Sequence, residues 1–185
     1  MIVTTGIMSS DSDEWATPQE LYDILDSEFH FNLDPCADET NHKCARFFTK
    51  EIDGLSQKWG GGDRVFMNPP YGSAIKDWVR KARESAERNG ALVVALLPAR
   101  TDTKWWQDVM GATEIRFIKG RVKFGESRNT APFPSVIAIW GTPRNPVIKT
   151  MEIDWRLKDK KVEDSAQGIV EKSGGYVGRV LIDDY

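Results

Sequence analysis

Short apolar runs and an amphipathic segment follow one another in the middle of the chain. Residues 65–67 and 91–97 are apolar runs, the first followed by Asn68-Pro69-Pro70 and the second by Pro98, a pattern typical of buried parallel strands. Between them, residues 73–89 repeat apolar side chains at helical spacing, with basic residues on the other faces and a glycine after the end. A helix between two parallel strands predicts a right-handed βαβ unit.

The N-terminal third of the chain predicts a helix followed by two short strands. Thr17 and Pro18, with Glu20 three residues after the threonine, are typical of a helix start, so we predict Thr17 as the N-cap. An apolar stripe after them indicates that this helix packs on the core. Alternation in residues 29–33 predicts a first strand that ends in an acidic loop, and the β-prone residues 45–49 predict a second strand.

The C-terminal half predicts a hairpin at the end of the sheet. Residues 115–118 and 122–124 alternate around Lys119-Gly120, and residues 133–140 form another apolar strand. Together these elements predict an α/β fold, with a doubly wound and mostly parallel sheet and an antiparallel C-terminal hairpin strand.

Changes of pattern set the predicted domain limits. Residues 1–13 have no periodicity and are expected to lack order. One domain is predicted over residues 14–146, because Pro143 and Pro146 mark its end. Residues 147–185 alternate locally but resemble no known segment. We interpret them as a C-terminal appendage, either a small β unit or a surface for a partner.

Length and composition suit one ordinary globular domain of 185 residues, 40% hydrophobic and 29% charged. The sequence has neither a run of about 18 apolar residues nor a signal-peptide pattern, so we expect a cytoplasmic protein without a membrane partner. Cys36, His42 and Cys44 lack the paired Cys-x-x-Cys spacing of a metal site. Buried thiols are therefore favoured, and we expect no metal.

Charge is unevenly distributed, although the net charge is only −3. Residues 1–63 contain 4 Lys or Arg and 13 Asp or Glu, whereas residues 64–149 contain 15 and 7. This distribution is expected if one part of the molecule binds a cationic cofactor and another faces phosphates. Chance segregation of solvated helix faces would also produce it.

The sequence Asn68-Pro69-Pro70-Tyr71 directly follows the apolar run 65–67. Two prolines cannot continue a sheet ladder, so a rigid loop is predicted at the sheet edge where ligands of α/β proteins bind. The Asn68 side chain and the Pro69 carbonyl are acceptors that would take the two hydrogens of a conjugated amino group and favour a pyramidal nitrogen. Tyr71 offers a ring on which a flat base can stack. The alternative is a proline-rich turn with an incidental asparagine.

This motif resembles motif IV of the S-adenosylmethionine-dependent amino-methyltransferases. Four other segments resemble the small phage DNA N-6-adenine methyltransferases (Dam-like): Trp15-Ala-Thr-Pro-Gln, Leu33-Asp-Pro-Cys-Ala, Leu97-Pro-Ala-Arg-Thr-Asp-Thr and Gly120-Arg-Val-Lys-Phe. The resemblance covers residues 14–140 and implies a Rossmann-like methyltransferase domain with S-adenosylmethionine as cofactor. The implied partner is double-stranded DNA with a flipped adenine, and the implied catalytic residues are Asn68, Pro69, Pro70 and Tyr71.

The resemblance also implies where the cofactor binds. Trp15, Thr17 and Pro18 correspond to the loop of motif X, which contacts the cofactor, although Trp15 would serve equally well as a core residue. Asn68 is expected to contact the cofactor as well.

An acidic loop is the other part of the implied cofactor site. Asp34, with Pro35 and Ala37, corresponds to motif I, where a carboxylate suits the cationic methionine end of the cofactor. This chain lacks the loop glycines of that motif. Asp53 corresponds to the residue that meets the adenine amino group of the cofactor, and an ordinary turn aspartate before Gly54 is the alternative.

Basic residues after the central motif are expected to bind DNA. They are Arg100, Lys104, Arg121, Lys123 and Arg128, with Arg128 as the candidate base reader. The oligomeric state is not indicated, and the resemblance is to enzymes of phages or prophages and of restriction-modification.

The same chemistry leaves alternatives open. It fits methylation of cytosine N4, of RNA or of a glutamine side chain. The missing glycines also fit a DNA-binding relative without catalytic activity.

Overall fold

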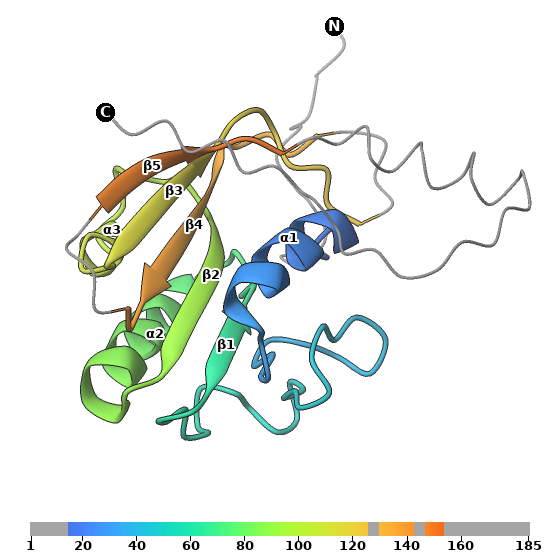
Figure 1. Cartoon of the computed structure of the whole chain (residues 1–185), viewed down its shortest axis with the longest axis vertical. Coiled ribbons are helices and arrows are strands. Elements are labelled where there is room, and N and C mark those ends of the chain that lie inside the picture. Colours follow the sequence, from blue (N-terminus) through green and yellow to red (C-terminus); the bar gives the residue numbers. More distant parts are fainter. Residues whose placement is uncertain (1–14, 126–129, 143–146, 154–185) are drawn as a thin grey trace, which may run out of the picture.

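A five-stranded sheet runs through the centre of the molecule (Figure 1). The structure, a computed structural model, describes residues 15–125, 130–142 and 147–153. The strands lie in the order β1-β2-β4-β3-β5. Their bounds are Arg64–Met67 for β1, Leu92–Pro98 for β2, Glu114–Ile118 for β3, Ser135–Trp140 for β4 and Val147–Met151 for β5.

Strand β4 runs in the opposite direction to the other four. β1 is parallel to β2, and β3 is parallel to β5, whereas β4 lies between β2 and β3 and is antiparallel to both. The predicted mostly parallel sheet with an antiparallel hairpin strand is therefore confirmed. As a consequence, β1, β2 and β3 all end at the same edge of the sheet, which we call the carboxyl edge.

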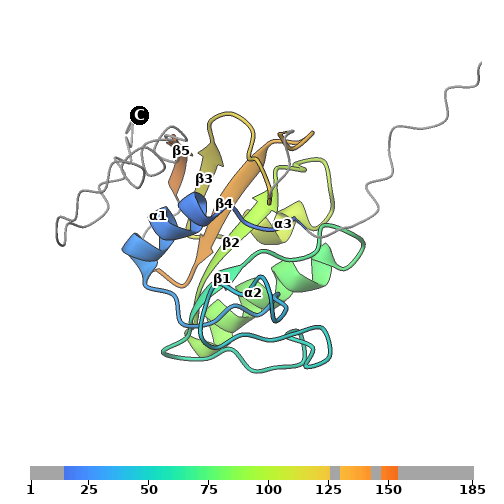
Figure 2. The ribbon, with the colours of Figure 1, turned by 90° about the vertical axis from the view of Figure 1, so that its right-hand side faces the viewer.

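Helices cover both faces of this sheet (Figure 2). α1 (Gln19–Phe29) lies on one face, and α2 (Ile75–Asn89) and α3 (Trp106–Val109) lie on the other. α2 connects the parallel strands β1 and β2, which confirms the predicted βαβ unit and the doubly wound arrangement. Gly90 ends α2 with a φ of 71°, a conformation that glycine adopts without strain. Within the described part of the chain, no helix has the length and apolar character needed to cross a membrane.

The two strands predicted before β1 are reduced to single bridges. Leu33 pairs with Val65 and Asp34 pairs with Phe47, both in parallel. The predicted first strand began too early, because Phe29 is the last residue of α1. Backbone hydrogen bonds on both sides nevertheless keep the 33–34 segment in line with the sheet, so Asp34 lies beside the end of β1.

Two predicted limits in the C-terminal half were wrong. Residues 122–124 form a loop instead of a strand, and β4 itself is the hairpin partner of β3. The limit predicted after residue 146 is too early, because β5 pairs with β3 in the same sheet. The segments 1–13 and 154–185 lie outside the described residues.

The start of α1 differs from the prediction. The helix begins at Gln19 with Pro18 at the N-cap position. Thr17, the predicted N-cap, instead accepts a hydrogen bond from Asn68 at the end of β1. A tertiary contact with a residue distant in sequence therefore replaces the local cap. Inside the helix, Tyr22 packs edge-on against Phe66 of β1, with ring centroids 5.2 Å apart.

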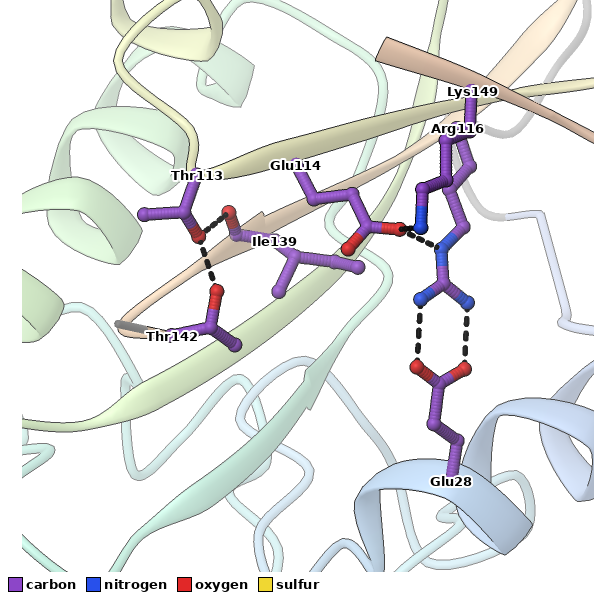
Figure 3. Close-up of polar contacts among 7 residues, drawn as sticks. All are labelled: Glu28, Thr113, Glu114, Arg116, Ile139, Thr142 and Lys149. Carbon is purple, nitrogen blue, oxygen red and sulfur yellow. Dashed lines mark hydrogen bonds and ion pairs between the residues drawn. The ribbon is translucent and has the colours of Figure 1, made fainter. Parts of the chain in front are cut away.

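An ion-pair network joins the other end of α1 to β3 and β5 (Figure 3). Arg116 of β3 is only 3% exposed, and its guanidinium donates two hydrogen bonds of 2.6 and 2.7 Å to Glu28. A third, of 2.7 Å, goes to Glu114, which is 2% exposed and lies 3.6 Å from the Lys149 ammonium. Arg116 and Glu114 are buried, so removing one of these two would leave the other as a less fully compensated buried charge, whereas Glu28 pairs with Arg116 from the exposed surface of α1 and thereby joins the helix to the sheet.

Candidate functional site

A cavity of about 950 Å³ lies at the carboxyl edge of the sheet, beside the end of β1. Its wall includes residues 15–17 before α1, several residues between 34 and 55, Phe66, residues 68–70 and Trp78 of α2. The structure therefore brings together most of the site residues predicted from the sequence: Trp15, Thr17, Asp34, Pro35, Ala37, Asp53, Asn68, Pro69 and Pro70. Pro18 and Tyr71 are not among the residues that line this cavity.

The side-chain amide of Asn68 is held at its nitrogen end. Nδ2 donates one hydrogen bond to the Trp15 carbonyl oxygen and another, of 2.9 Å, to the Thr17 hydroxyl. Because a carbonyl oxygen can only accept, the first contact establishes which end of the amide is the NH2 group. Oδ1 is buried and has no hydrogen-bond partner among the described residues. Buried acceptors are rarely unpaired, so this oxygen is available to a donor on a bound molecule.

Pro69 and Pro70 border the cavity, but the Tyr71 ring lies inside the protein. The ring is 4% exposed, and its hydroxyl donates a 3.2 Å hydrogen bond to the Leu96 carbonyl of β2. Burial raises the pKa of Tyr71 well above its usual value, so the hydroxyl keeps its proton. The open stacking face predicted for Tyr71 is therefore covered, because the hydroxyl uses an acceptor in the core.

Four aromatic rings pack together beside Asn68. Trp15 is stacked on Tyr71 with 6.4 Å between centroids and 22° between planes. The Trp15 ring also makes edge contacts with Phe124 at 5.3 Å and Phe133 at 5.1 Å. The sequence analysis did not identify these two phenylalanines as site residues: Phe124 ends the segment Gly120-Arg-Val-Lys-Phe, in which only the basic residues were assigned a role, and Phe133 belongs to none of the quoted segments. Trp15 is thus a core residue that also borders the cavity.

Asp34 is 4% exposed and forms part of the cavity wall. One carboxylate oxygen accepts a 3.3 Å hydrogen bond from the Cys36 backbone N–H, and the other accepts a 3.0 Å bond from the Lys43 backbone N–H. Burial raises the pKa of the Asp34 carboxyl, and these two backbone donors act in the opposite direction. Both carboxylate oxygens of Asp34 therefore bind backbone N–H groups of the loop that follows it and fix the shape of that loop.

Gly54 approaches that loop too closely for any side chain. A Cβ atom at this position would lie 2.2 Å from the Pro35 carbonyl oxygen and 3.0 Å from the Trp78 ring. The absence of a side chain at Gly54 thus allows the backbones of the two loops to pack against each other. The sequence analysis missed this role, because the contact joins two loops and follows no spacing rule.

Asp53 combines two properties that the sequence analysis treated as alternatives. It is a turn residue, with a φ of 55° and a side-chain oxygen that accepts a 3.1 Å hydrogen bond from the Leu55 backbone N–H. It also lies on the cavity wall.

Carboxylates outnumber ammonium groups on the wall of the cavity. The acidic residues there are Asp34, Asp38, Glu51 and Asp53, and the basic ones are Lys43 and Lys50. An excess of negative charge in a partly closed cavity favours a positively charged ligand. Trp15, Phe48 and Trp78 add aromatic surface to the same wall.

The cysteines and the neighbouring histidine are engaged in packing. His42 is stacked on Phe47, with centroids 4.1 Å apart. Cys44 is buried, and its Sγ lies 3.6 Å from the Tyr22 hydroxyl. Cys36 is partly buried on the cavity wall, where burial raises the pKa of its thiol. The residues described here contain no group of three or more His, Cys, Asp or Glu side chains arranged to hold a metal ion.

Four of the basic residues expected to bind DNA lie on segments that leave the carboxyl edge of the sheet. Arg100 and Lys104 follow β2, and Arg121 and Lys123 follow β3. All four are exposed. Arg128, the fifth, lies outside the described residues.

The sheet with one reversed strand, the cavity at its carboxyl edge and the Asn-Pro-Pro-Tyr loop beside it are the features expected from the resemblance to the amino-methyltransferases. The chain belongs to the DNA N-6-adenine-methyltransferase (Dam) family, whose model matches residues 4–165. It is 36% identical over 109 residues to the DNA N-6-adenine-methyltransferase of Escherichia phage T1. The aligned region covers 58% of this chain and 45% of that protein. It is 32% identical over 155 residues to the DNA N-6-adenine-methyltransferase of Haemophilus phage HP1, with coverage of 79% and 88%. The chain thus spans less than half the length of the phage T1 relative.

The fold has a counterpart among solved structures. A "modification subunit of a putative type I restriction enzyme" from Vibrio vulnificus superimposes with a TM-score of 0.51 at 10% identity, over 95% of this chain and 59% of that one. At this identity the likeness concerns the fold alone.

Gly54→Ala is expected to weaken binding of S-adenosylmethionine, the cofactor that the resemblance implies. The added Cβ would clash with the Pro35 carbonyl and displace the loop that contains Asp34. Overpacking of this kind should lower the free energy of unfolding by about 1–3 kcal/mol. Calorimetric titration with the cofactor and chemical denaturation measure the two effects.

Gly60→Ala is the matched control. The nearest atom to a Cβ at Gly60 is the flexible Lys58 Cε, 3.8 Å away. This variant should bind the cofactor as the wild type does. Equal cofactor affinity in Gly54→Ala and Gly60→Ala would contradict the role given to Gly54.

Proposed function

We propose that this chain methylates the N6 amino group of adenine in DNA, with S-adenosylmethionine as methyl donor. The observation that supports this most directly is the buried, unpaired Oδ1 atom of Asn68, a residue that lines the cavity at the end of β1. Pro69, the next residue in the chain, also lines the cavity, and its carbonyl would supply a second acceptor. Membership of the Dam family favours adenine over cytosine N4, RNA or a glutamine side chain as the target.

The two acceptors would act on the amino group before and during methyl transfer. The lone pair of an amine on an aromatic ring is delocalised, which makes the nitrogen a poor nucleophile. Acceptors that take both N–H hydrogens favour a pyramidal nitrogen and stabilise the positive charge that develops on it. Asn68 and Pro69 would therefore act by positioning and electrostatics, not as a base.

The cavity fits the cofactor in size and charge. Its volume of about 950 Å³ is in the range of small-molecule sites. When bound, S-adenosylmethionine supplies an electrophilic methyl group on a sulfonium. The carboxylates of the wall would hold its positive charge: Asp34, Asp38, Glu51 and Asp53. The contact of Gly54 with the Pro35 carbonyl sets the shape of the wall between them.

The target base would have to leave the DNA stack to reach Asn68. The Trp15 ring borders the cavity and would provide a stacking surface, and Tyr71, buried in the same aromatic cluster, would support that ring. The exposed basic residues at the carboxyl edge would hold the phosphates around the flipped nucleotide.

The proposed activity is tested by nucleoside mass spectrometry. DNA is incubated with the protein and S-adenosylmethionine, digested and analysed. We expect N6-methyladenine from the wild type. Asn68→Ala should lower the rate by about 10²- to 10³-fold, because a hydrogen bond of the transition state is lost. Cofactor affinity measured by calorimetry should remain nearly unchanged.

Asn32→Ala provides a matched asparagine control. Asn32 also makes hydrogen bonds with both ends of its side-chain amide, but at the start of β1, away from the cavity. Its rate should equal that of the wild type. Formation of N4-methylcytosine, absence of any methylated nucleoside, or an Asn68→Ala variant with most of its activity would each contradict the proposal.

DNA binding is expected to depend on salt through the residues at the carboxyl edge. If Lys104 and Arg121 each neutralise a phosphate, Lys104→Ala and Arg121→Ala should each reduce the slope of log K against log salt concentration by about 0.9. Fluorescence anisotropy with labelled duplex DNA measures this slope. Lys58→Ala, which removes an exposed charge at the opposite edge, should leave it unchanged. Slopes that are the same for all three variants and the wild type would exclude DNA from this edge.

A further inference from the structure

We infer that Thr17 is a positioning residue for methyl transfer. Its hydroxyl, together with the Trp15 carbonyl, orients the Asn68 amide so that Oδ1 is presented as an acceptor. The inference rests on the proposed function, because it explains how Asn68 would keep the orientation that the reaction needs.

An asparagine side chain needs such control because its two ends are nearly the same in shape and opposite in hydrogen bonding. Rotation of the amide by half a turn exchanges the acceptor and the donor. In the flipped orientation Oδ1 would face the Trp15 carbonyl oxygen, and two acceptors would meet without a proton between them. The hydrogen bond to Trp15 therefore disfavours the flip.

Thr17 pairs with the same nitrogen from a second direction. The Trp15 carbonyl uses one of the two Nδ2 hydrogens, and the Thr17 hydroxyl, 2.9 Å away and on a buried residue, uses the other. Without the hydroxyl, one buried N–H would have no partner within the site, and the amide would be free to tilt about the remaining bond. Oδ1 would then no longer be held in one place.

The position of Thr17 is itself supported by the fold. It directly precedes Pro18, the N-cap residue of α1, and α1 is fixed by the packing of Tyr22 on Phe66 and by the ion pair between Glu28 and Arg116. The segment before α1 is also joined to the loop after β3, because the Gly125 N–H donates a 2.8 Å hydrogen bond to the Ala16 carbonyl.

A role of Thr17 in cofactor binding, which the family resemblance implies, makes a different prediction. A residue that holds the cofactor affects its affinity, whereas a residue that orients Asn68 affects the rate with bound substrates. The test is a set of variants that remove or keep the hydroxyl with little change of volume: Thr17→Val, Thr17→Ser and, as control, Thr113→Val. Thr113 also uses its hydroxyl in hydrogen bonds, to the Ile139 carbonyl at 2.9 Å and with Thr142 at 2.8 Å, but at the start of β3 (Figure 3).

Thr17→Val should lower kcat by about 2- to 10-fold, the effect of one hydrogen bond. Its cofactor affinity by calorimetry should stay at the wild-type value. Thr17→Ser should restore kcat, because the hydroxyl returns. Thr113→Val should reduce Tm without changing kcat. An unchanged kcat in Thr17→Val, or a loss confined to cofactor affinity, would overturn the inference.

A second measurement does not depend on activity. In nitrogen-15 NMR spectra, the side-chain NH2 signals of Asn68 are assigned by their absence in Asn68→Ala. They should exchange slowly with water in the wild type and in Thr17→Ser, and faster in Thr17→Val. If the wild type methylates no adenine, the proposed function fails while this result still decides the role of Thr17. Equal exchange in Thr17→Val and the wild type would overturn the inference whatever the activity.

Discussion

The site depends on the orientation of one amide. Asn68 is placed at the end of β1 by the sheet, but its function as an acceptor requires that Nδ2, and not Oδ1, faces the Trp15 carbonyl. That requirement ties the end of β1 to a segment that lies 51 residues earlier in the chain at Thr17. The buried Oδ1 atom, without a partner among the described residues, is the consequence, and a polar atom left in this state is typical of a functional site.

The surrounding structure holds three segments in place at the carboxyl edge: the residues before α1, the loop of Asp34 and the loop of Gly54. α1 fixes the segment of Trp15 and Thr17, and the buried Arg116 of β3 joins α1 to the sheet through its ion pair with Glu28. Asp34 holds its own loop through two backbone N–H groups, and the absence of a side chain at Gly54 lets the neighbouring loop pack against it. The same loops supply the carboxylates of the cavity wall, so part of the negative charge of residues 1–63 lies around the cavity.

The sequence predicted those elements whose limits depend on the local pattern of apolar and polar residues. The apolar run before Asn68, the amphipathic residues 73–89 and the strand that follows were predicted with nearly correct limits, because burial on one or both faces determines them. The sequence could not predict contacts between distant segments: Thr17 with Asn68, Gly54 with Pro35, and β5 with β3. A threonine before a proline has the same local pattern whether it caps a helix or binds a side chain, and only the tertiary fold decides between these two.

The most direct test of this account is the methylation rate of Asn68→Asp at pH 8, measured on the same DNA as the wild type. An ionised carboxylate also offers acceptors, so a site that needs only an acceptor at this position would tolerate the change. If the Trp15 carbonyl sets the orientation, the carboxylate oxygen that replaces Nδ2 would face another acceptor in a buried place, and the rate should fall by about tenfold or more. A rate equal to that of the wild type, with unchanged cofactor affinity, would contradict the central role given to this hydrogen bond.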